Sequence, residues 1–426
     1  MGVDLVLRGK APWSLKGLFA GKTLLLDRAI EWLRQNHGKS LNRIHHYHDD
    51  AGKLCVQIYL HPLDFIEIAP EGKNAIRISA KTSPLGAGYH RYLCDLFNKM
   101  GTALDLKWKV LEEDTGYFQG GDADRIEDLM LQWLGAASRR ISQARAEGTS
   151  VLTLNMNMDE GFDFAGVLTP MGPRDDAWLE RTAGNPLLGT DIFPWWDFDP
   201  HRALKTWAES VMWSEIRWRK PLDKNEAIGM RLACAWLDQA HAAYPDLTYP
   251  WREWLELMDL CGWEPKTGRA RIEEKASRCE GPLIGYRRRD VTFLKIRPWS
   301  IRVPGSFADR SDSAERFILD DDTRRVLITG FRTAKDFDPA WLLEKHDPAT
   351  IAEKLEYAAD NYRSAALIFN QPDDAQMQSV SYAGKHALIC TYVCPPEERQ
   401  WAIDTWRSIK FSESKPTWQQ ERFGGQ

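Results

Sequence analysis

Tryptophan is concentrated in the middle of this chain, and this constrains the fold more than any other feature of the sequence. The 426 residues include 19 tryptophans, and nine of these lie between positions 195 and 263. Indole rings supply much of the buried contact area of cores and interfaces, so they are rarely left in water in such numbers. The sequence therefore predicts a distinct, densely packed central unit. Its tryptophans are Trp195, Trp196, Trp207, Trp213, Trp218, Trp236, Trp251, Trp254 and Trp263.

Helix signals accompany these tryptophans. Asp199 before Pro200 is a typical N-cap followed by a first helical position. Asp223 stands three residues before Glu226, as in a capping box. Apolar residues follow each signal at helical spacing. We therefore expect a helical, Trp-rich subdomain of three helices within residues 151–280, joined by short links and preceded by a loop-rich stretch.

The first 150 residues alternate between helix and strand patterns. The letters "DDAG" separate two strand-like runs and have turn chemistry, which predicts a hairpin. Strands that follow one another through short turns form an antiparallel sheet. Residues 1–150 are therefore expected to be an α+β domain with helices packed on that sheet. The expected helices cover 24–38, 88–100 (closed by Gly101) and 122–148, and the expected strands cover 43–48, 53–60, 65–68, 75–80 and 104–110.

Short strand patterns return from about position 281. Residues 316–332 have the pattern of a hairpin. Residues 347–362 are expected to be a helix, with Asp347 as its N-cap and Pro348 at its first position. The stretch "PEERQWAIDTWRSIKF" predicts a closing helix. The chain is thus predicted to be a multidomain α+β protein with domains at 1–150, 151–280 and 281–426.

Three stretches near the C-terminus resemble a known fold. They are "WSIRVPGSF", "VSYAGKHALICTYVC" and "QWAIDTWRSIKF", within residues 299–411. They resemble the first strand and turn, the paired strands and the final helix of the PsbP-like α/β/α sandwich. The resemblance implies such a sandwich in this part of the chain. Members include photosystem subunits, a Ran-binding factor and effector chaperones of type VI secretion, so the resemblance also implies a protein partner rather than a reaction.

Charge and cysteine usage narrow the class of protein. The net charge is -5 and the isoelectric point about 6.1, and no basic face is evident, so a nucleic-acid partner is not expected. The run Arg287–Arg289 is interpreted as a solvated strand end. The seven cysteines match neither a disulfide framework nor a zinc pattern, which suits the cytoplasm. Because no run of about 20 apolar residues and no secretory pattern is present, we expect no membrane association.

Histidines gather in "RIHHYHDDAG", which raises the possibility of a metal site. Side chains alternate between the two faces of a strand, so His46 and His48 share one face while His45 lies on the other. His46 and His48 could chelate a transition metal only if a third ligand, such as His61, came from a neighbouring strand. The alternative, which the sequence favours, is a hairpin end with polar rings near solvent.

The stretch "SAKTSPLGAGYH" leads from a strand through a glycine-containing loop into a helix. Helix N-termini bind anions, so Lys81, Thr82 and Ser83 are candidate anion-binding residues. The spacing matches no phosphate-loop or dinucleotide fingerprint. The alternative is a strand-to-helix turn that supplies its own caps.

An acidic stretch over 112–124 is the most enzyme-like part of the sequence. If the protein is an enzyme, His90, Asp114 and Tyr117 are the candidate catalytic residues, because a carboxylate beside a histidine can carry out acid–base chemistry. The calcium-loop spacing is absent. The alternative is a strand-to-helix loop whose carboxylates are favoured by the helix dipole.

Two aromatic stretches are candidates for binding a partner. Trp and Arg are enriched among the residues that dominate binding energy in interfaces. The alternative is that these side chains fill the junction between domains. Neither interpretation requires catalysis. The candidates are Phe193, Trp195, Trp196, Phe198, Trp213, Arg217 and Trp218.

The sequence contains no nucleophile elbow, zinc-protease, phosphate-loop or cysteine-protease signature, and no cofactor is expected. It therefore favours a non-enzymatic, cytoplasmic protein-binding protein. The more specific hypothesis is a bacterial immunity or chaperone-type protein that binds a toxin or a secreted effector, whose basic surface this acidic chain would mask. The alternative is a hydrolase or nucleotide-handling enzyme with its site in the N-terminal domain. A third possibility is a structural subunit of a larger assembly.

Overall fold

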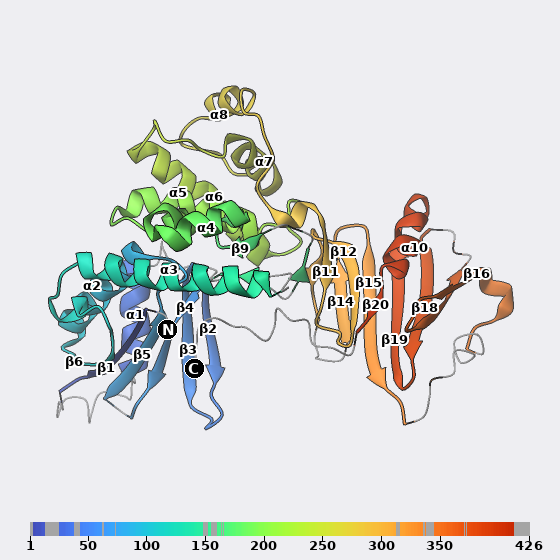
Figure 1. Ribbon diagram of the computed structural model, residues 1–426, viewed down its shortest axis with the longest axis horizontal. Coiled ribbons are helices and arrows are strands. Elements are labelled where there is room, and N and C mark those ends of the chain that lie inside the picture. The colour runs from blue at the N-terminus through green and yellow to red at the C-terminus, as the bar shows by residue number, and fades with distance from the viewer. Residues whose placement is uncertain are drawn as a thin grey trace.

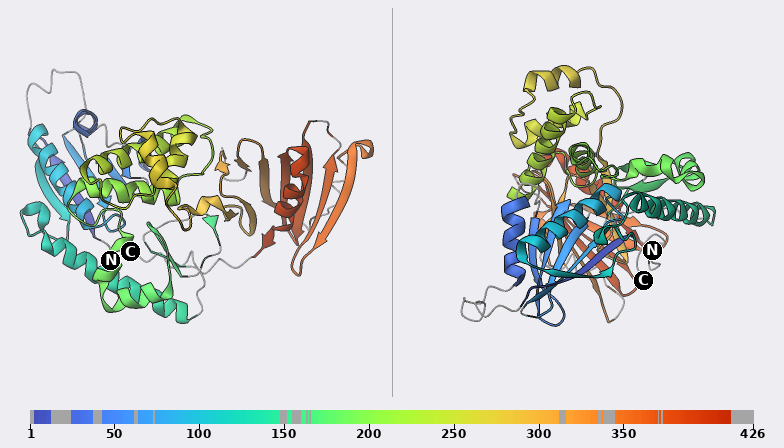
Figure 2. Two further views of the ribbon diagram at one scale, coloured as in Figure 1. Left: turned by 90° about the horizontal axis from the view of Figure 1, so that it is seen from above. Right: turned by 90° about the vertical axis from the view of Figure 1, so that its left-hand side faces the viewer.

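The computed structural model places two groups of elements side by side along its long axis (Figure 1). One group holds the N-terminal sheet with the helical subdomain above it, and the other holds the C-terminal strands. The same elongated arrangement is visible from above (Figure 2). The structure describes residues 3–12, 25–37, 43–61, 64–72, 74–147, 152–154, 160–162, 164, 166–311, 316–334, 337, 345–369, 371 and 373–412.

A six-stranded antiparallel sheet with helices on it forms the N-terminal part. Its elements are β1 (Asp4–Lys10), α1 (Leu25–His37), β2 (Arg43–His48), β3 (Leu54–His61), β4 (Asp64–Pro70), β5 (Ala75–Lys81), α2 (Ala87–Leu104), β6 (Lys107–Glu112), η2 (Tyr117–Gln119) and α3 (Asp124–Ala146). The strand order is β2-β3-β4-β5-β1-β6. The predicted hairpin is confirmed: His46 lies opposite Val56, and the Asp49 carboxylate accepts the Lys53 N–H (2.8 Å) in the turn. Apolar side chains at alternate strand positions share one core with α1 and α2.

The sequence predicted that Gly101 ends the second helix, and this prediction is wrong. Helix α2 continues to Leu104, and Asp105 takes the left-handed conformation with φ of 54°. A Cβ on Gly101 would overlap Nε1 of Trp108, whose indole crosses the helix at this point. That Nε1 donates to the Phe97 carbonyl at 3.1 Å. The glycine therefore permits close approach of an indole rather than helix termination.

The central part is mainly helical. Its elements are β7 (Leu152–Thr153), β9 (Val167–Thr169), β10 (Gly172–Arg174), α4 (Asp176–Gly184), η3 (Pro186–Ile192), α5 (Pro200–Ser214), α6 (Lys224–Ala243), α7 (Trp251–Cys261) and α8 (Arg269–Ala276). Both predicted caps are confirmed: the Asp199 carboxylate accepts the His201 N–H (2.9 Å), and the Asp223 carboxylate accepts the Glu226 N–H (2.9 Å). Helices α4 and α8 were not predicted from the sequence.

The N-terminal sheet and the helical subdomain share one hydrophobic core. A single buried cluster runs from Leu5 in β1 through Tyr89 in α2 to Ala276 in α8. The boundary expected at residue 150 therefore does not separate two cores. A second cluster, from Tyr286 to Ile409, belongs to the C-terminal strands.

Two antiparallel sheets make up the C-terminal part. Their elements are β8 (Glu160–Gly161), η4 (Tyr286–Arg288), β11 (Asp290–Phe293), β12 (Trp299–Pro304), β13 (Ala308–Asp309), β14 (Arg316–Asp320), β15 (Arg325–Arg332), η5 (Pro348–Thr350), β16 (Ile351–Ala358), β17 (Arg363–Phe369), β18 (Ala375–Ala383), β19 (His386–Cys394), η6 (Pro396–Glu398), α10 (Arg399–Arg407) and β20 (Lys410–Phe411). The strand orders are β13-β14-β15-β19-β18-β17-β16 and β20-β12-β11-β8. Strand β8 precedes the helical subdomain and β11 follows it, yet Gly161 lies opposite Thr292 and Glu160 opposite Phe293.

The prediction of a helix over residues 347–362 is wrong. Asp347 does cap a turn, because its carboxylate accepts the Ala349 N–H at 2.9 Å, but only the short η5 follows. From Ile351 the chain is the edge strand β16, paired with β17. Lateral pairing with β17 offsets the helix propensity of this segment, since tertiary contacts routinely override local preference.

The remaining C-terminal predictions are largely confirmed. Strands β14 and β15 form the expected hairpin, and β18 and β19 pair across Gly384. The closing helix is α10, which contacts β12, β18 and β19. Among the described residues after 281, α10 is the one α-helix. The α+β class with antiparallel sheets is confirmed, and the resemblance to the PsbP-like fold stays a prediction. In the described part of the chain, no helix combines the length and apolar content needed to cross a bilayer.

Candidate functional site

The candidate catalytic histidine lies in a closed hydrogen-bond network. His90 is 0% exposed; its Nδ1 lies 2.8 Å from the Thr82 hydroxyl and its Nε2 lies 3.2 Å from a Glu113 carboxylate oxygen. The Thr82 hydroxyl donates its proton to the Val3 carbonyl (2.7 Å), so it must accept from Nδ1. Both ring nitrogens therefore face oxygen acceptors inside the protein.

Glu113 completes this network from the end of β6. Burial alone would raise the pKa of Glu113, but hydrogen bonds from His90 and Thr115 outweigh it and lower that pKa to about 2. The Thr115 hydroxyl and the Thr115 N–H (2.9 Å) both donate to the same carboxylate oxygen. The Glu113 side chain is 1% exposed. Such burial is typical of a carboxylate in a structural ion pair, whereas a general base must be open to substrate.

Asp114 and Tyr117 do not join His90. The Asp114 side chain is exposed, while Tyr117 lies half-buried and its hydroxyl donates to Asp95 at 3.3 Å. The partner of His90 is thus the neighbour of the carboxylate that the sequence favoured. Position 113 or 114 could not be chosen from the sequence, because the alternation of β6 ends at Glu112 and the chain then turns.

The predicted anion site is not open to a ligand. Thr82 is 0% exposed and Ser83 is 7% exposed, and the Thr82 hydroxyl is used by Val3 and His90. The N–H of Gly88, in the first turn of α2, donates to the Trp196 carbonyl at 3.0 Å. The helix terminus is therefore capped by the protein itself. Lys81 is exposed at the end of β5.

The proposed metal ligands do not converge. His46 and His48 are exposed on β2, and His45 stacks on Tyr47 on the opposite face, as strand alternation predicts. His61 lies at the far end of β3, where its ring packs 5.3 Å from that of Trp207. Burial lowers the pKa of His61 to about 3, against a weak opposing hydrogen bond from the Trp207 backbone. Within the described ranges, no cluster of three or more metal-ligating side chains occurs.

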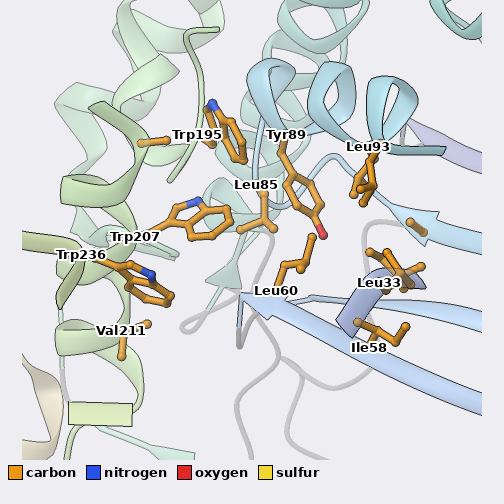
Figure 3. Close-up of a cluster of buried hydrophobic side chains, with 14 of the residues drawn as sticks. Leu33, Ile58, Leu60, Leu85, Tyr89, Leu93, Trp195, Trp207, Val211 and Trp236 are labelled. Atoms are coloured by element: carbon orange, nitrogen blue, oxygen red, sulfur yellow. The ribbon is translucent and has the colours of Figure 1, made fainter. Parts of the chain in front are cut away.

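Among the candidate partner anchors, Trp195 fills the junction between the sheet and the helices, and Phe193 belongs to a neighbouring buried cluster. Trp195 is 5% exposed and Phe193 is 3% exposed, so neither forms an open binding surface. The ring of Trp195 lies 5.2 Å from that of Trp207 and 6.1 Å from that of Tyr89. Figure 3 shows the tryptophans Trp195, Trp207 and Trp236 facing Leu60 and Tyr89 across this junction.

Trp196 and Phe198 border the same junction and are half-buried. The ring of Trp196 stacks on that of Phe193 at 5.2 Å. The Arg91 guanidinium lies 4.4 Å from the centre of the Phe198 ring. The aromatic loop, residues 193–198, is thus held by contacts with α2 and by contacts within the loop. Its geometry matches the alternative interpretation, a filled junction.

Trp213, Arg217 and Trp218 lie at the second junction, between the helices and the C-terminal strands. The ring of Trp213 lies 5.7 Å from that of Tyr286. Arg217 Nε donates to the Phe307 carbonyl at 2.8 Å. The guanidinium of Arg288 covers Trp218 and lies 3.5 Å from the centre of its ring.

Arg289 is exposed, as expected of a solvated strand end, but the other two arginines of the run are not. Arg287 forms an ion pair with Glu160 at 2.8 Å and donates to the Ser214 carbonyl at 3.0 Å. Arg288 forms a bidentate pair with Glu256, at 3.0 and 2.7 Å. These guanidiniums join η4 to β8, α5 and α7. The sequence could not assign them, because their carboxylate partners lie far away in the chain.

An exposed apolar ridge lies elsewhere, on η3. Leu187 and Leu188 are each 57% exposed, which is unusual for two adjacent leucines in a structured turn. Beside them a groove of ≈ 330 Å³ is lined by Pro186 and by Gln132 and Arg139 of α3. We call Pro186–Leu188 the leucine ridge. The letters "NPLLGT" lack both helix and strand periodicity. Two leucines outside any such pattern are the only sequence feature that could have indicated an exposed ridge.

Acidic side chains line the first turns of α3. Asp124 and Asp128 are exposed, and Asp128 borders the groove beside the leucine ridge. Partial burial and the charges of Asp124 and Asp128 raise the pKa of Glu127. Three carboxylates within two helical turns create a local negative potential. The ridge therefore has an acidic flank.

Comparisons with known proteins find little. No family model matches this chain. No curated protein matches it. One similar solved structure is a crystal structure from Bacteroides thetaiotaomicron VPI-5482, with 10% sequence identity and a TM-score of 0.19. The alignment covers 27% of this chain and 46% of that one, so the chain spans about half the length of that structure, and the likeness carries no argument about fold or function.

Proposed function

We propose that this chain is a non-enzymatic protein-binding protein of the bacterial immunity or chaperone type, which binds a toxin or a secreted effector in the cytoplasm. The observation that carries the proposal is the leucine ridge beside the acidic turns of α3. Exposed apolar side chains rimmed by charge are typical of surfaces that bind another protein. The acidic flank selects a basic partner and speeds its encounter.

Two further observations favour binding over catalysis. His90 and Glu113, the one histidine–carboxylate pair near the acidic stretch, are 0% and 1% exposed, so a substrate cannot reach them. The Asp114 side chain is exposed, and the Tyr117 hydroxyl donates to Asp95 instead. The resemblance of residues 299–411 to PsbP-like domains also favours a protein partner. All seven cysteines are free thiols, which supports a reducing compartment.

Affinity capture from the native host, with the full chain as bait, tests this proposal. The retained protein is identified by mass spectrometry, and crosslinks locate its contact. We expect a basic protein crosslinked to residues 124–139 and 186–188. The double variant L187S/L188S should weaken its binding by about tenfold or more, since buried leucines contribute ~1.5–3 kcal/mol each.

Ile228→Ser is the matched control. Ile228 is 46% exposed on α6, away from the ridge, so its replacement should leave the affinity unchanged. Asp124→Asn with Asp128→Asn should slow association and reduce its salt dependence. The proposal fails if no specific protein is captured, or if L187S/L188S binds the captured protein as tightly as I228S does.

A further inference from the structure

A basic hollow lies at one end of the seven-stranded sheet, in the C-terminal part of the chain. It has a volume of ≈ 480 Å³, within the usual size range of small-molecule sites. Strand β15 ends there, and the turns before β17 and between β18 and β19 lie beside it. Its lining includes Arg332, Asn361, Gly384, Lys385, His386 and Phe411.

Hydrogen bonds fix the walls of this hollow. The Lys385 carbonyl accepts both the N–H (2.8 Å) and the hydroxyl (3.1 Å) of Thr333. The Asn361 amide donates to the Phe411 carbonyl at 2.9 Å. The rings of His386 and Phe411 lie 5.7 Å apart. A site whose walls are already held in place loses little entropy when a ligand binds.

Within the described residues, two cations of the hollow have no carboxylate partner. Arg325, at the other end of β15, is paired with Asp320 at 3.2 Å. Across the described residues, by contrast, Arg332 and Lys385 form no ion pair. Arg332 also lies directly opposite His386 in the β15–β19 ladder, next to Lys385. Basic side chains from two neighbouring strands therefore border the hollow.

We propose that the basic hollow binds the phosphate group of a small molecule. The guanidinium of Arg332 offers a fork of N–H donors that matches phosphate oxygens, and the Lys385 ammonium adds a second charge. Gly384 has no side chain and nothing within 4 Å of its Cβ position, so it leaves room for the ligand.

The source of the phosphate is either the free ion or an organic phosphate. The ring of Phe411 lines the hollow and is half-buried, so it offers an apolar face to the organic part. An aromatic base adds stacking energy on such a face. This inference is independent of the proposed protein partner, because the hollow and the leucine ridge belong to different groups of elements.

Isothermal titration calorimetry on the full chain tests it, with inorganic phosphate, AMP and adenosine as the probes. We expect AMP or phosphate to bind, adenosine not to bind measurably, and the affinity to fall as salt is raised. AMP binding tighter than phosphate assigns an organic phosphate; equal binding assigns the free ion. Arg332→Gln and Lys385→Gln should each weaken binding by about tenfold, the loss expected for one charged hydrogen-bond donor.

Lys354→Gln is the matched control, because Lys354 is an exposed lysine of the same sheet that lies outside the hollow. It should bind like the unchanged protein. All variants alter exposed side chains, and unchanged thermal unfolding would show that they fold. The proposal is overturned if neither phosphate nor AMP binds the unchanged protein, or if R332Q and K385Q bind as tightly as K354Q.

Discussion

The ring of His61, the last residue of β3, packs 5.3 Å from the ring of Trp207 on α5. This contact joins the N-terminal sheet to the helical subdomain. Because both rings are buried, the imidazole has lost its water, and the neutral form is favoured. A titratable group thus lies inside the core that the two parts share, and the stability of that core depends on pH.

Acidification should destabilise the protein through His61. The folded pKa of about 3 lies below the ordinary value of 6.5, so between these pH values the unfolded chain takes up a proton that the folded chain does not. The free energy of unfolding should fall by up to about 1.4 kcal/mol per pH unit in this window. Urea denaturation of wild type and His61→Gln at pH 7 and pH 5 should show a shallower loss in H61Q. His46→Gln, at an exposed imidazole, is the control; a shared slope in all three proteins would contradict the expectation.

Glu113→Gln should destabilise the protein at neutral pH. The carboxylate accepts hydrogen bonds from His90 and Thr115 while 1% exposed, so we expect a loss of about 1.5–3 kcal/mol. Its folded pKa of about 2 lies below the ordinary 4.5, so this stabilisation is present above pH 4.5 and is lost as the pH falls toward 2. Denaturant midpoints measured across this range should converge for the two proteins. Asp114→Asn, an exposed neighbour, should change stability by less than about 0.5 kcal/mol.

Two helical glycines should respond in opposite directions to alanine. A Cβ on Gly88 would overlap the Asp197 carbonyl oxygen and the indole of Trp195, so Gly88→Ala should cost about 1–3 kcal/mol. Gly229 of α6 has nothing within 4 Å of its Cβ position, so Gly229→Ala should stabilise by about 0.5–1 kcal/mol. Thermal unfolding measures both. Equal effects of the two changes would mean that the aromatic loop does not pack on α2 as described.

Arg287→Met should destabilise the junction between the helices and the C-terminal strands. Arg287 and Glu160 are 12% and 16% exposed, so loss of the cation leaves a poorly solvated carboxylate. We expect a cost of about 3–5 kcal/mol. Arg278→Met removes an exposed pair with Glu274, at 68% and 55% exposure, and should cost less than about 1 kcal/mol. Urea unfolding compares them; a similar cost for both would show that the Arg287 pair is not a structural contact.

Local chemistry made part of the fold predictable. Asp199 and Asp223 could be assigned as caps because a cap is made within three residues of the chain. The β2–β3 hairpin was recognisable for the same reason, since Asp49 closes its own turn. Residues 347–362 were misassigned because Ile351–Ala358 becomes a strand through pairing with β17, and such a partner leaves no local signal.

The candidate sites were harder to predict because their partners are distant in sequence. The sequence placed His90 with Asp114 and Tyr117, but in the structure its partners are Glu113 and Thr82, and the Thr82 hydroxyl donates to the Val3 carbonyl. The sequence indicated that the tryptophans form contacts. It could not show whether these contacts are internal or with a partner, because that depends on how α5 packs on β3. Leu187 and Leu188 carried no pattern, and only their 57% exposure distinguishes them.

The pairing of β8 with β11 makes the helical subdomain an insertion whose two ends leave the same sheet. Glu160 lies opposite Phe293, and the ring of Phe162 stacks on that of Tyr286 at 4.9 Å. A single cut in a loop of the subdomain would therefore yield two fragments that stay associated through backbone pairing and ring stacking. The chain is suited to being divided there into two separately produced pieces that reassemble, and circular permutants opened within the subdomain should retain the C-terminal sheets.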